Sequence, residues 1–221
     1  MSAKPYILQI DLEEKPCLVV GAGPIALHKT RHLVESGAQV TVVSTTFHAG
    51  FDDLVLHARH ERPFEDADIE GMTLVHAATQ HLDVNAHIAE RCAAQDILCS
   101  VANDSSLGSF GSPALLDVGE LRVAISTNGH SPSYGARLRR EIAGQLPEYL
   151  DEYLAFLGAQ RALSKECIPD AQLRMRLNAY LASPEFETLF ITLDDEALEE
   201  VLSVLLEHPE RISADYDPHW G

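Results

Sequence analysis

Hydrophobic positions in the first half of the chain follow two periods, one typical of buried strands and one typical of helices. Short apolar runs at residues 18–20, 39–43, 73–79 and 97–101 predict strands. Apolar stripes at helical spacing predict helices over 25–35 and 83–94, and a weaker pattern predicts a short helix over 52–56 and a strand over 60–64. Because strands alternate with helices, the sequence predicts an α/β fold with a parallel, doubly wound sheet.

The pattern changes after residue 112. Apolar residues at alternate positions predict a strand over 121–127, and Pro132 begins a predicted helix that runs to about residue 146, before Pro147. Four further helices are predicted, at 149–164, 170–182, 184–191 and 194–207. The predicted organisation is an α/β domain over 1–112, a connecting segment over 113–148 and a small α-helical C-terminal domain over 149–221.

The first strand leads directly into a glycine-rich turn, Gly21-Ala22-Gly23-Pro24-Ile25-Ala26, with the pattern G-x-G-x-x-A. Gly21 permits a tight turn, Gly23 lets the backbone approach a pyrophosphate, and Ala26 allows close packing of helix and strand. The helix that starts at Pro24 and Ile25 supplies free N–H groups for phosphate. These features predict a Rossmann-like dinucleotide-binding domain with a nicotinamide cofactor. A glycine-rich turn that binds nothing is the alternative.

Small and polar residues follow the other predicted strands. Ligands of a parallel sheet lie beyond the carboxyl ends of its strands, so Ser44, residues 78–79 and residues 100–104 are expected to meet the glycine turn at one crevice. No Asp or Glu ends the second strand to bind a ribose, and no Arg stands beside it for a 2′-phosphate. Ser44 is a weaker ribose partner, and the choice between NAD and NADP stays open on this feature.

Composition narrows the class of partner. The chain has 221 residues and a formal net charge of −18, which argues against nucleic acid and against anionic membrane surfaces. No apolar run is long enough to cross a membrane and no secretory signal is visible, so we expect a cytoplasmic protein with reduced thiols. The four cysteines lack C-x-x-C spacing and the eleven histidines lack compact ligand spacing, so no metal site is predicted.

One stretch reverses the acidic balance. Residues 121–150 contain Arg122, Arg137, Arg139 and Arg140 but only Glu141 and Glu148 as acids. This local excess of positive charge favours an anionic ligand. The alternative is a solvated helix surface with ion pairs such as Arg137–Glu141 at i,i+4.

Four motifs occur together in this chain. They are the glycine turn at 21–26, Ala77-Ala78-Thr79 with Asn85 six residues on, the run 100–104 ahead of Phe110 and Pro113, and Ala124-Ile125-Ser126-Thr127-Asn128-Gly129-His130-Ser131-Pro132 ahead of Arg137. The set resembles the precorrin-2 dehydrogenase family, which is also found as the N-terminal part of bifunctional siroheme synthases. The resemblance covers residues 5–150, and segment 124–132 is its most specific part.

The resemblance implies an enzyme that removes two hydrogens from precorrin-2, a tetrapyrrole with eight carboxylates, and forms sirohydrochlorin with NAD as oxidant. It implies cofactor contacts by Gly21, Gly23, Pro24, Ile25, Ala26, Ser44, Ala78, Thr79 and Asn85, and substrate contacts by His130, Ser131 and Arg137. Ser131 also suits a helix N-cap, and a plain surface role is equally open for His130. A homodimer built through residues 113–148 is implied as well.

This chain differs from the family's pattern at the position of the catalytic acid that the resemblance implies. The family's run Asn-Val-Val-Asp places an aspartate seven residues before a Phe, and here that position is Asn103, with Asp104 beside it. Asparagine takes up no proton at neutral pH and offers a metal no anionic oxygen. Asp104 and Asn103 are therefore the candidate catalytic residues, and we expect dehydrogenation with doubtful chelatase activity. The alternatives are a bifunctional dehydrogenase and ferrochelatase that uses Asp104 or His130 for iron, and a non-catalytic tetrapyrrole carrier or assembly protein.

Overall fold

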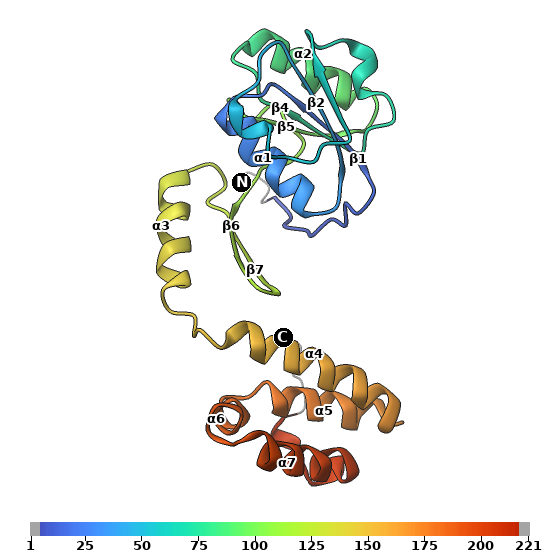
Figure 1. Cartoon of the computed structure of the whole chain (residues 1–221), viewed down its shortest axis with the longest axis vertical. Helices are drawn as coiled ribbons and strands as arrows, with labels where there is room; N and C mark the ends of the chain where they lie inside the picture. The colour runs from blue at the N-terminus through green and yellow to red at the C-terminus, as the bar shows by residue number, and fades with distance from the viewer. Residues whose placement is uncertain (1–4, 217–221) are drawn as a thin grey trace. The chain divides into compact units, whose positions relative to one another are not determined.

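The computed structural model describes residues 5–216, which form two compact units (Figure 1). The first unit contains residues 5–113 together with Ser126–Pro132. The second contains Ala114–Ile125 and residues 133–216. Within residues 5–216, no helix combines the length and the apolar character that crossing a membrane requires.

The first unit is built on a parallel sheet of five strands. The strands are β1 (Pro16–Val20), β2 (Gln39–Ser44), β3 (Ala58–Glu61), β4 (Leu74–Ala77) and β5 (Leu98–Val101), in the order β3-β2-β1-β4-β5. Two long helices, α1 (Pro24–Glu35) and α2 (Leu82–Ala93), connect β1 to β2 and β4 to β5. The predicted α/β fold with a doubly wound parallel sheet is thereby confirmed.

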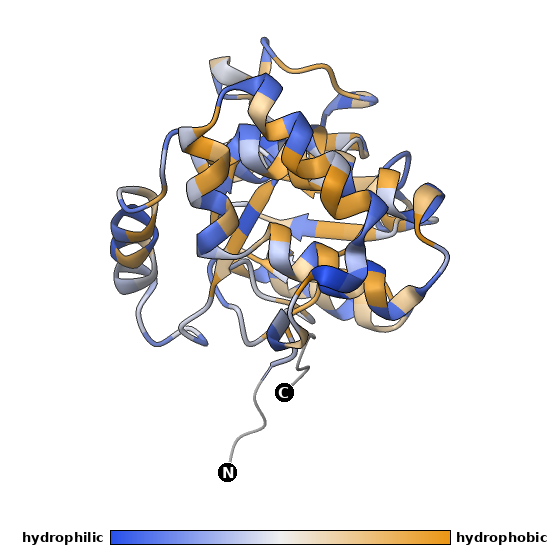
Figure 2. Cartoon of the chain, turned by 90° about the horizontal axis from the view of Figure 1, so that it is seen from below, coloured by the Kyte–Doolittle hydropathy of each residue, from blue (hydrophilic) through white to orange (hydrophobic). Residues whose placement is uncertain are grey.

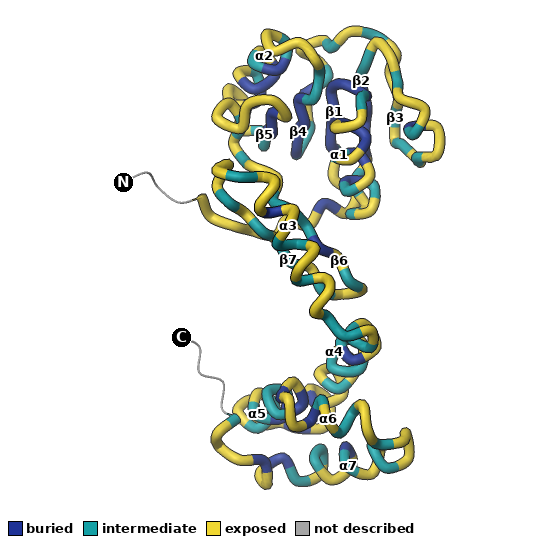
Figure 3. Tube along the Cα trace, turned by 90° about the vertical axis from the view of Figure 1, so that its left-hand side faces the viewer, coloured by how far each residue is buried: buried dark blue, intermediate teal, exposed yellow. Residues whose placement is uncertain are grey.

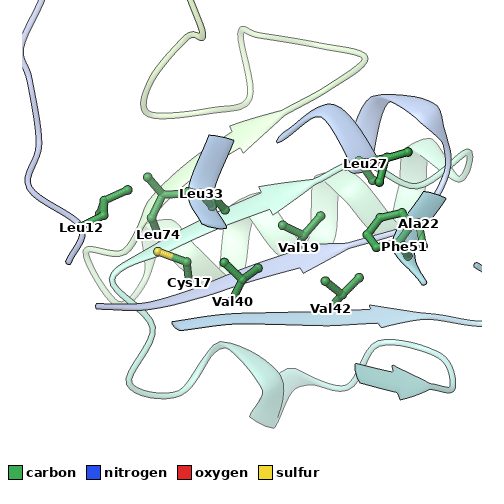
Figure 4. Close-up of a cluster of buried hydrophobic side chains, with 11 residues drawn as sticks. Leu12, Cys17, Val19, Ala22, Leu27, Leu33, Val40, Val42, Phe51 and Leu74 are labelled. Atoms are coloured by element: carbon green, nitrogen blue, oxygen red, sulfur yellow. The ribbon is translucent and has the colours of Figure 1, made fainter. Parts of the chain in front are cut away.

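The sheet has a hydrophobic core on each face, as a parallel sheet requires. Alternate residues of β1 point to opposite faces, so Val19 packs with Leu27 and Leu33 of α1, whereas Leu18 packs with Ile88 of α2. Figure 4 shows the first of these clusters between α1 and the strands. Figure 3 shows that β1 and β4 are almost wholly buried. Figure 2 shows that hydrophobic and hydrophilic residues alternate in bands along the helices. This core fixes the carboxyl edge of the sheet on which the candidate site lies.

The stretch between β2 and β4 differs from its prediction. No helix covers residues 52–56; a 3-10 helix, η1 (Ala49–Phe51), precedes them instead, and a second, η2 (Asp66–Ile69), follows β3. The His48 ring accepts a hydrogen bond from the Gly50 amide, and Phe51 is buried, so these two residues fix the first 3-10 turn. Strand β3 ends at Glu61, which pairs with Ser44, the last residue of its only neighbour β2 among the described strands.

The second unit begins with an antiparallel hairpin, β6 (Ala114–Val118) and β7 (Leu121–Ile125), followed by α3 (Pro132–Ala143). The sequence predicted β7 and the start of α3 but not β6. The residues of β6 are mostly half-buried, so no clear alternation marked it. The hairpin turn needs a positive φ at Gly119, which is +53°.

Four helices complete the second unit, as predicted: α4 (Leu150–Cys167), α5 (Ala171–Leu181), α6 (Pro184–Thr192) and α7 (Asp195–Glu207). Two short 3-10 helices, η3 (Pro209–Arg211) and η4 (Ala214–Tyr216), follow them. Side chains of Asp170, Ser183 and Asp194 accept hydrogen bonds from backbone amides in the first turns of α5, α6 and α7. Tyr153 and Phe186 anchor a separate aromatic core between these helices.

Candidate active site

The glycine turn after β1 is sterically constrained at its first glycine. Gly21 has a φ of +102°, and a Cβ there would lie 2.7 Å from the Ala78 carbonyl carbon and 3.0 Å from the Thr79 nitrogen. The Gly21 amide donates to the Val43 carbonyl at 2.8 Å, which ties the turn to the end of β2. Only glycine satisfies both the backbone conformation and the close approach of residues 78–79.

The second glycine faces open space. Apart from Gly23 itself and its two chain neighbours, no residue has an atom within 4 Å of the position that a Cβ of Gly23 would take. The first intrahelical hydrogen bond of α1 runs from the Leu27 amide to the Gly23 carbonyl, so the amides of Ile25 and Ala26 have no acceptor within the helix. Pro24 occupies the first turn, where its missing N–H costs nothing, and the buried Ala26 packs against the sheet. An open glycine, free amides and a helix N-terminus fit the pyrophosphate of a dinucleotide.

The loop between β4 and α2 forms the wall beside this turn. Asn85 is 1 % exposed and lies beneath the loop. Its Oδ1 accepts from the Thr79 amide at 3.1 Å and lies 2.7 Å from the Thr79 hydroxyl, and its Nδ2 donates to the Thr79 carbonyl at 3.0 Å. Of the residues predicted to contact the cofactor, Ala78 and Thr79 therefore adjoin the glycine turn, while the Asn85 amide is occupied within the loop.

The end of β2 adjoins the glycine turn from another side, and the edge formed by the turn, residues 78–79 and the end of β2 is the predicted ligand crevice. The Ser44 hydroxyl donates to the Thr46 carbonyl at 2.7 Å, which folds the strand end back on itself. The His48 amide donates to the Ala22 carbonyl at 2.9 Å, so the segment after β2 is attached directly to the glycine turn. Sequence reasoning missed this attachment, because a backbone hydrogen bond leaves no residue-type signal.

The two candidate catalytic residues have different surroundings. Asn103 is exposed, and its Nδ2 donates to the Thr79 carbonyl at 3.3 Å, which places its side chain at the crevice wall. The Asp104 carboxylate instead accepts from the amide and the hydroxyl of Ser106, at 2.9 and 2.6 Å. These hydrogen bonds hold the pKa of Asp104 below its usual range, which makes it a weak base.

The residues expected to meet the substrate divide between the two units. His130 and Ser131 belong to the unit that contains the parallel sheet, and both of their amides donate to Thr127, at 3.0 and 3.1 Å. Arg137 belongs to the second unit. Its guanidinium lies 3.3 Å from the Glu141 carboxylate and stacks on the Tyr134 ring, so the predicted i,i+4 ion pair is present.

One buried titratable residue near the crevice escaped the sequence analysis. His76 lies on β4 within an apolar run, is 6 % exposed and packs edge-on against Phe110. Burial, followed by the positive charge of Lys29, lowers the pKa of His76 to about 4, so the ring is neutral at physiological pH. Within the described residues, no group of three or more His, Cys, Asp or Glu side chains is arranged to hold a metal ion.

The strand order, the glycine turn and the helix N-terminus together define a dinucleotide-binding protein of the Rossmann class. A family model described as putative NAD(P)-binding matches residues 8–114, and a model described as the central domain of sirohaem biosynthesis proteins matches residues 118–145. The chain therefore belongs to the sirohaem-biosynthesis family that the sequence motifs indicated, and its first unit is a nicotinamide-dinucleotide-binding domain.

Curated relatives agree with this assignment. The chain is 35% identical over 199 residues to a siroheme synthase of Thioalkalivibrio sulfidiphilus, covering 89% of this chain and 41% of the relative. It is 36% identical over 171 residues to a siroheme synthase of Psychromonas ingrahamii, covering 75% and 36%. The chain thus spans less than half the length of these relatives.

A solved structure shares the fold. The structure named SirC, precorrin-2 dehydrogenase, superposes with a TM-score of 0.76 over 92% of this chain and 99% of its own, at 24% sequence identity. At that identity the match establishes the fold, while the activity has to be argued from the site.

Proposed function

We propose that this protein is an NAD-dependent precorrin-2 dehydrogenase that forms sirohydrochlorin. The observation that carries the proposal is the arrangement at the carboxyl edge of the sheet, where the open Gly23 and the amides of α1 that lack a helical acceptor lie beside residues 78–79, to which Asn103 is hydrogen-bonded. Relatives named siroheme synthase and a fold shared with a precorrin-2 dehydrogenase support the choice of substrate.

Dehydrogenation places modest chemical demands on the side chains. When bound, the nicotinamide ring supplies the hydride acceptor, and the second hydrogen leaves the substrate as a proton. Asp104 is a weak base because its carboxylate is held by Ser106, and Asn103 accepts no proton at neutral pH. The contribution of the chain is therefore to orient the two reactants and to release the proton to water.

We propose NAD rather than NADP as the oxidant. The end of β2 and the segment after it, residues 44–47, carry no cationic side chain to meet a 2′-phosphate. The guanidinium of the nearby Arg59 is engaged by Asp52 at 2.8 Å and lies over the Phe47 ring. Because the same segment also lacks an acid that would repel the 2′-phosphate, we expect a preference for NAD and not an absolute exclusion of NADP.

Substrate recognition is proposed for His130, Ser131 and Arg137, with the arginine-rich segment as the source of positive charge for the substrate carboxylates. We also propose a homodimer formed through residues 113–148 and a cytoplasmic location, in keeping with four free cysteines. Chelatase activity is proposed to be weak or absent, since Asn103 offers iron no anionic oxygen.

An anaerobic assay with freshly generated precorrin-2 tests these proposals. Sirohydrochlorin is expected with NAD, more slowly with NADP, and not without a dinucleotide. Addition of Fe²⁺ is expected to leave siroheme formation at its uncatalysed rate. Accelerated siroheme formation would favour the bifunctional enzyme, and binding of NAD and tetrapyrrole without turnover would favour a carrier.

A further inference from the structure

We propose that Asn103 and Asn85 are positioning residues that hold the Thr79 carbonyl between them and thereby set the shape of the nucleotide crevice. The inference rests on the proposed function in taking that crevice as the NAD site. In this proposal Asn103 acts as a hydrogen-bond donor. It is then more than a residue that has replaced the family's catalytic aspartate.

The two asparagines converge on one oxygen atom. Asn85 Nδ2 lies 3.0 Å from the Thr79 carbonyl oxygen and Asn103 Nδ2 lies 3.3 Å from it. A carbonyl oxygen only accepts hydrogen bonds and has two lone pairs, so each amide must present its NH₂ group and together they occupy both lone pairs. One donor is the buried Asn85 of α2 and the other comes from the exposed segment after β5, so the clamp joins two elements across the loop.

The clamped carbonyl belongs to the peptide between residues 79 and 80, and the peptide before it, 78–79, lies against the glycine turn and donates its Thr79 amide to Asn85 Oδ1. A Cβ at Gly21 would lie 3.0 Å from the Thr79 nitrogen and 2.7 Å from the Ala78 carbonyl carbon, so the turn and the loop are already in contact. Because both peptides share Thr79, a rotation at Thr79 would move the 78–79 peptide and change the space above the turn. A fixed peptide keeps the crevice in the form that a pyrophosphate requires, without an ordering cost when it binds.

Asp104 supports this arrangement from the next position in the chain. Its carboxylate accepts from the amide and the hydroxyl of Ser106, which closes a tight turn directly after Asn103. That turn fixes the backbone from which the Asn103 side chain reaches Thr79. The neighbouring aspartate thus has a local structural partner, and the asparagine has the contact with the crevice wall.

A carboxylate at position 103 is predicted to be harmful. An ionised aspartate has no hydrogen to donate, and its oxygens would repel the Thr79 carbonyl. Asn103→Asp should therefore weaken NAD binding more than Asn103→Ala, which only removes the donor. If Asn103 were merely a lost catalytic acid, Asn103→Asp would leave NAD affinity unchanged and would restore the missing chemistry.

The test is NAD binding by calorimetry on the full-length protein, which needs no tetrapyrrole. Asn103→Ala is expected to raise Kd for NAD about fivefold, the value of one ordinary hydrogen bond, and Asn103→Asp at least tenfold. Asn85→Asp, which keeps the acceptor for the Thr79 amide but loses the donor, is expected to raise Kd in the same way. Ser105→Ala, an exposed residue of the same turn, is the matched control and should bind NAD as the wild type does.

Two further readouts separate positioning from other roles. In the dehydrogenase assay the Asn103 variants should raise KM for NAD more than they lower kcat, and their thermal unfolding midpoints should match that of the wild type because Asn103 is exposed. Equal NAD affinity in Asn103→Asp and wild type would overturn the inference even if the enzyme turns over. Failure of the wild type to oxidise precorrin-2 would overturn the proposed function and leave the binding result standing.

Discussion

At the scale of single residues, Gly21 and Gly23 belong to the same motif but differ in what surrounds them. Gly21 is required by a positive φ and by the contact with residues 78–79, whereas no neighbouring group constrains Gly23, so the proposed pyrophosphate site is the reason we assign to it. The sequence identified both through the strand–turn–helix context. It did not reveal that the Asn85 amide is occupied by Thr79, because the residue type does not say which partner a buried amide finds.

The two glycines therefore give a matched pair of variants. Gly21→Ala should destabilise the protein by about 2 kcal/mol or more, since it adds a Cβ to a left-handed residue in contact with Ala78. Gly23→Ala should fold with stability within about 1 kcal/mol of wild type but lose NAD affinity at least tenfold, because its methyl group enters the space of the pyrophosphate. Urea unfolding and calorimetry measure the two effects. Normal NAD binding by Gly23→Ala would contradict the assignment of the crevice.

His76 predicts a pH dependence of stability. Its pKa in the folded protein is about 4 against 6.5 for the free side chain, with burial as the main cause and Lys29 as the second. As pH falls below 6.5, the His76 side chain becomes protonated in the unfolded chain but stays neutral in the folded protein. The free energy of unfolding therefore decreases between pH 6.5 and about pH 4. The loss should approach about 3 kcal/mol at most. In His76→Leu, the free energy of unfolding measured with urea should depend less on pH in this range. The control His130→Gln, at an exposed position, should keep the pH dependence of the wild type. An unchanged pH dependence in His76→Leu would refute the assignment.

At the scale of elements, periodicity predicted most of the fold. The alternation of strands and helices predicted the parallel sheet. Proline positions and the helical spacing of apolar residues predicted α3 to α7 close to their observed bounds. It failed where local contacts decide the structure, as at η1, where the His48 ring caps the turn and Phe51 anchors it. It also missed β6, whose half-buried residues are stabilised by pairing with β7.

The hairpin and α4 make a contact that no periodicity predicts. Asp151, in the first turn of α4, accepts a hydrogen bond from the Glu120 amide at 3.3 Å, and a Cβ on Gly119 would collide with its carboxylate. Gly119→Ala should therefore lower the free energy of unfolding by about 2 kcal/mol. The double variant Gly119→Ala/Asp151→Ala removes the collision. Its loss in free energy of unfolding should therefore be smaller than the sum of the losses in the two single variants. Strict additivity in urea unfolding would mean that the turn does not contact α4.

At the scale of the whole molecule, a chain with a net charge of −18 carries a local excess of arginine over residues 121–150. Arg122 is paired with Asp117 and Arg137 with Glu141, so much of the positive charge is already balanced within the second unit. Charge counting predicted an anionic ligand for this segment but could not show which arginines are engaged by acids. The aromatic packing of Tyr153 and Phe186 within the helical unit was equally beyond the sequence, because it depends on contacts between helices.

The central claim is that the crevice beside Gly23 holds NAD while precorrin-2 is oxidised. The most direct measurement is the stoichiometry of NADH and sirohydrochlorin in an anaerobic reaction of the purified full-length protein, with Gly23→Ala in parallel. The account predicts one NADH for each sirohydrochlorin with the wild type, and a strongly reduced yield of both at the same NAD concentration with Gly23→Ala. Sirohydrochlorin formed without NADH, or equal rates for the two proteins, would contradict it.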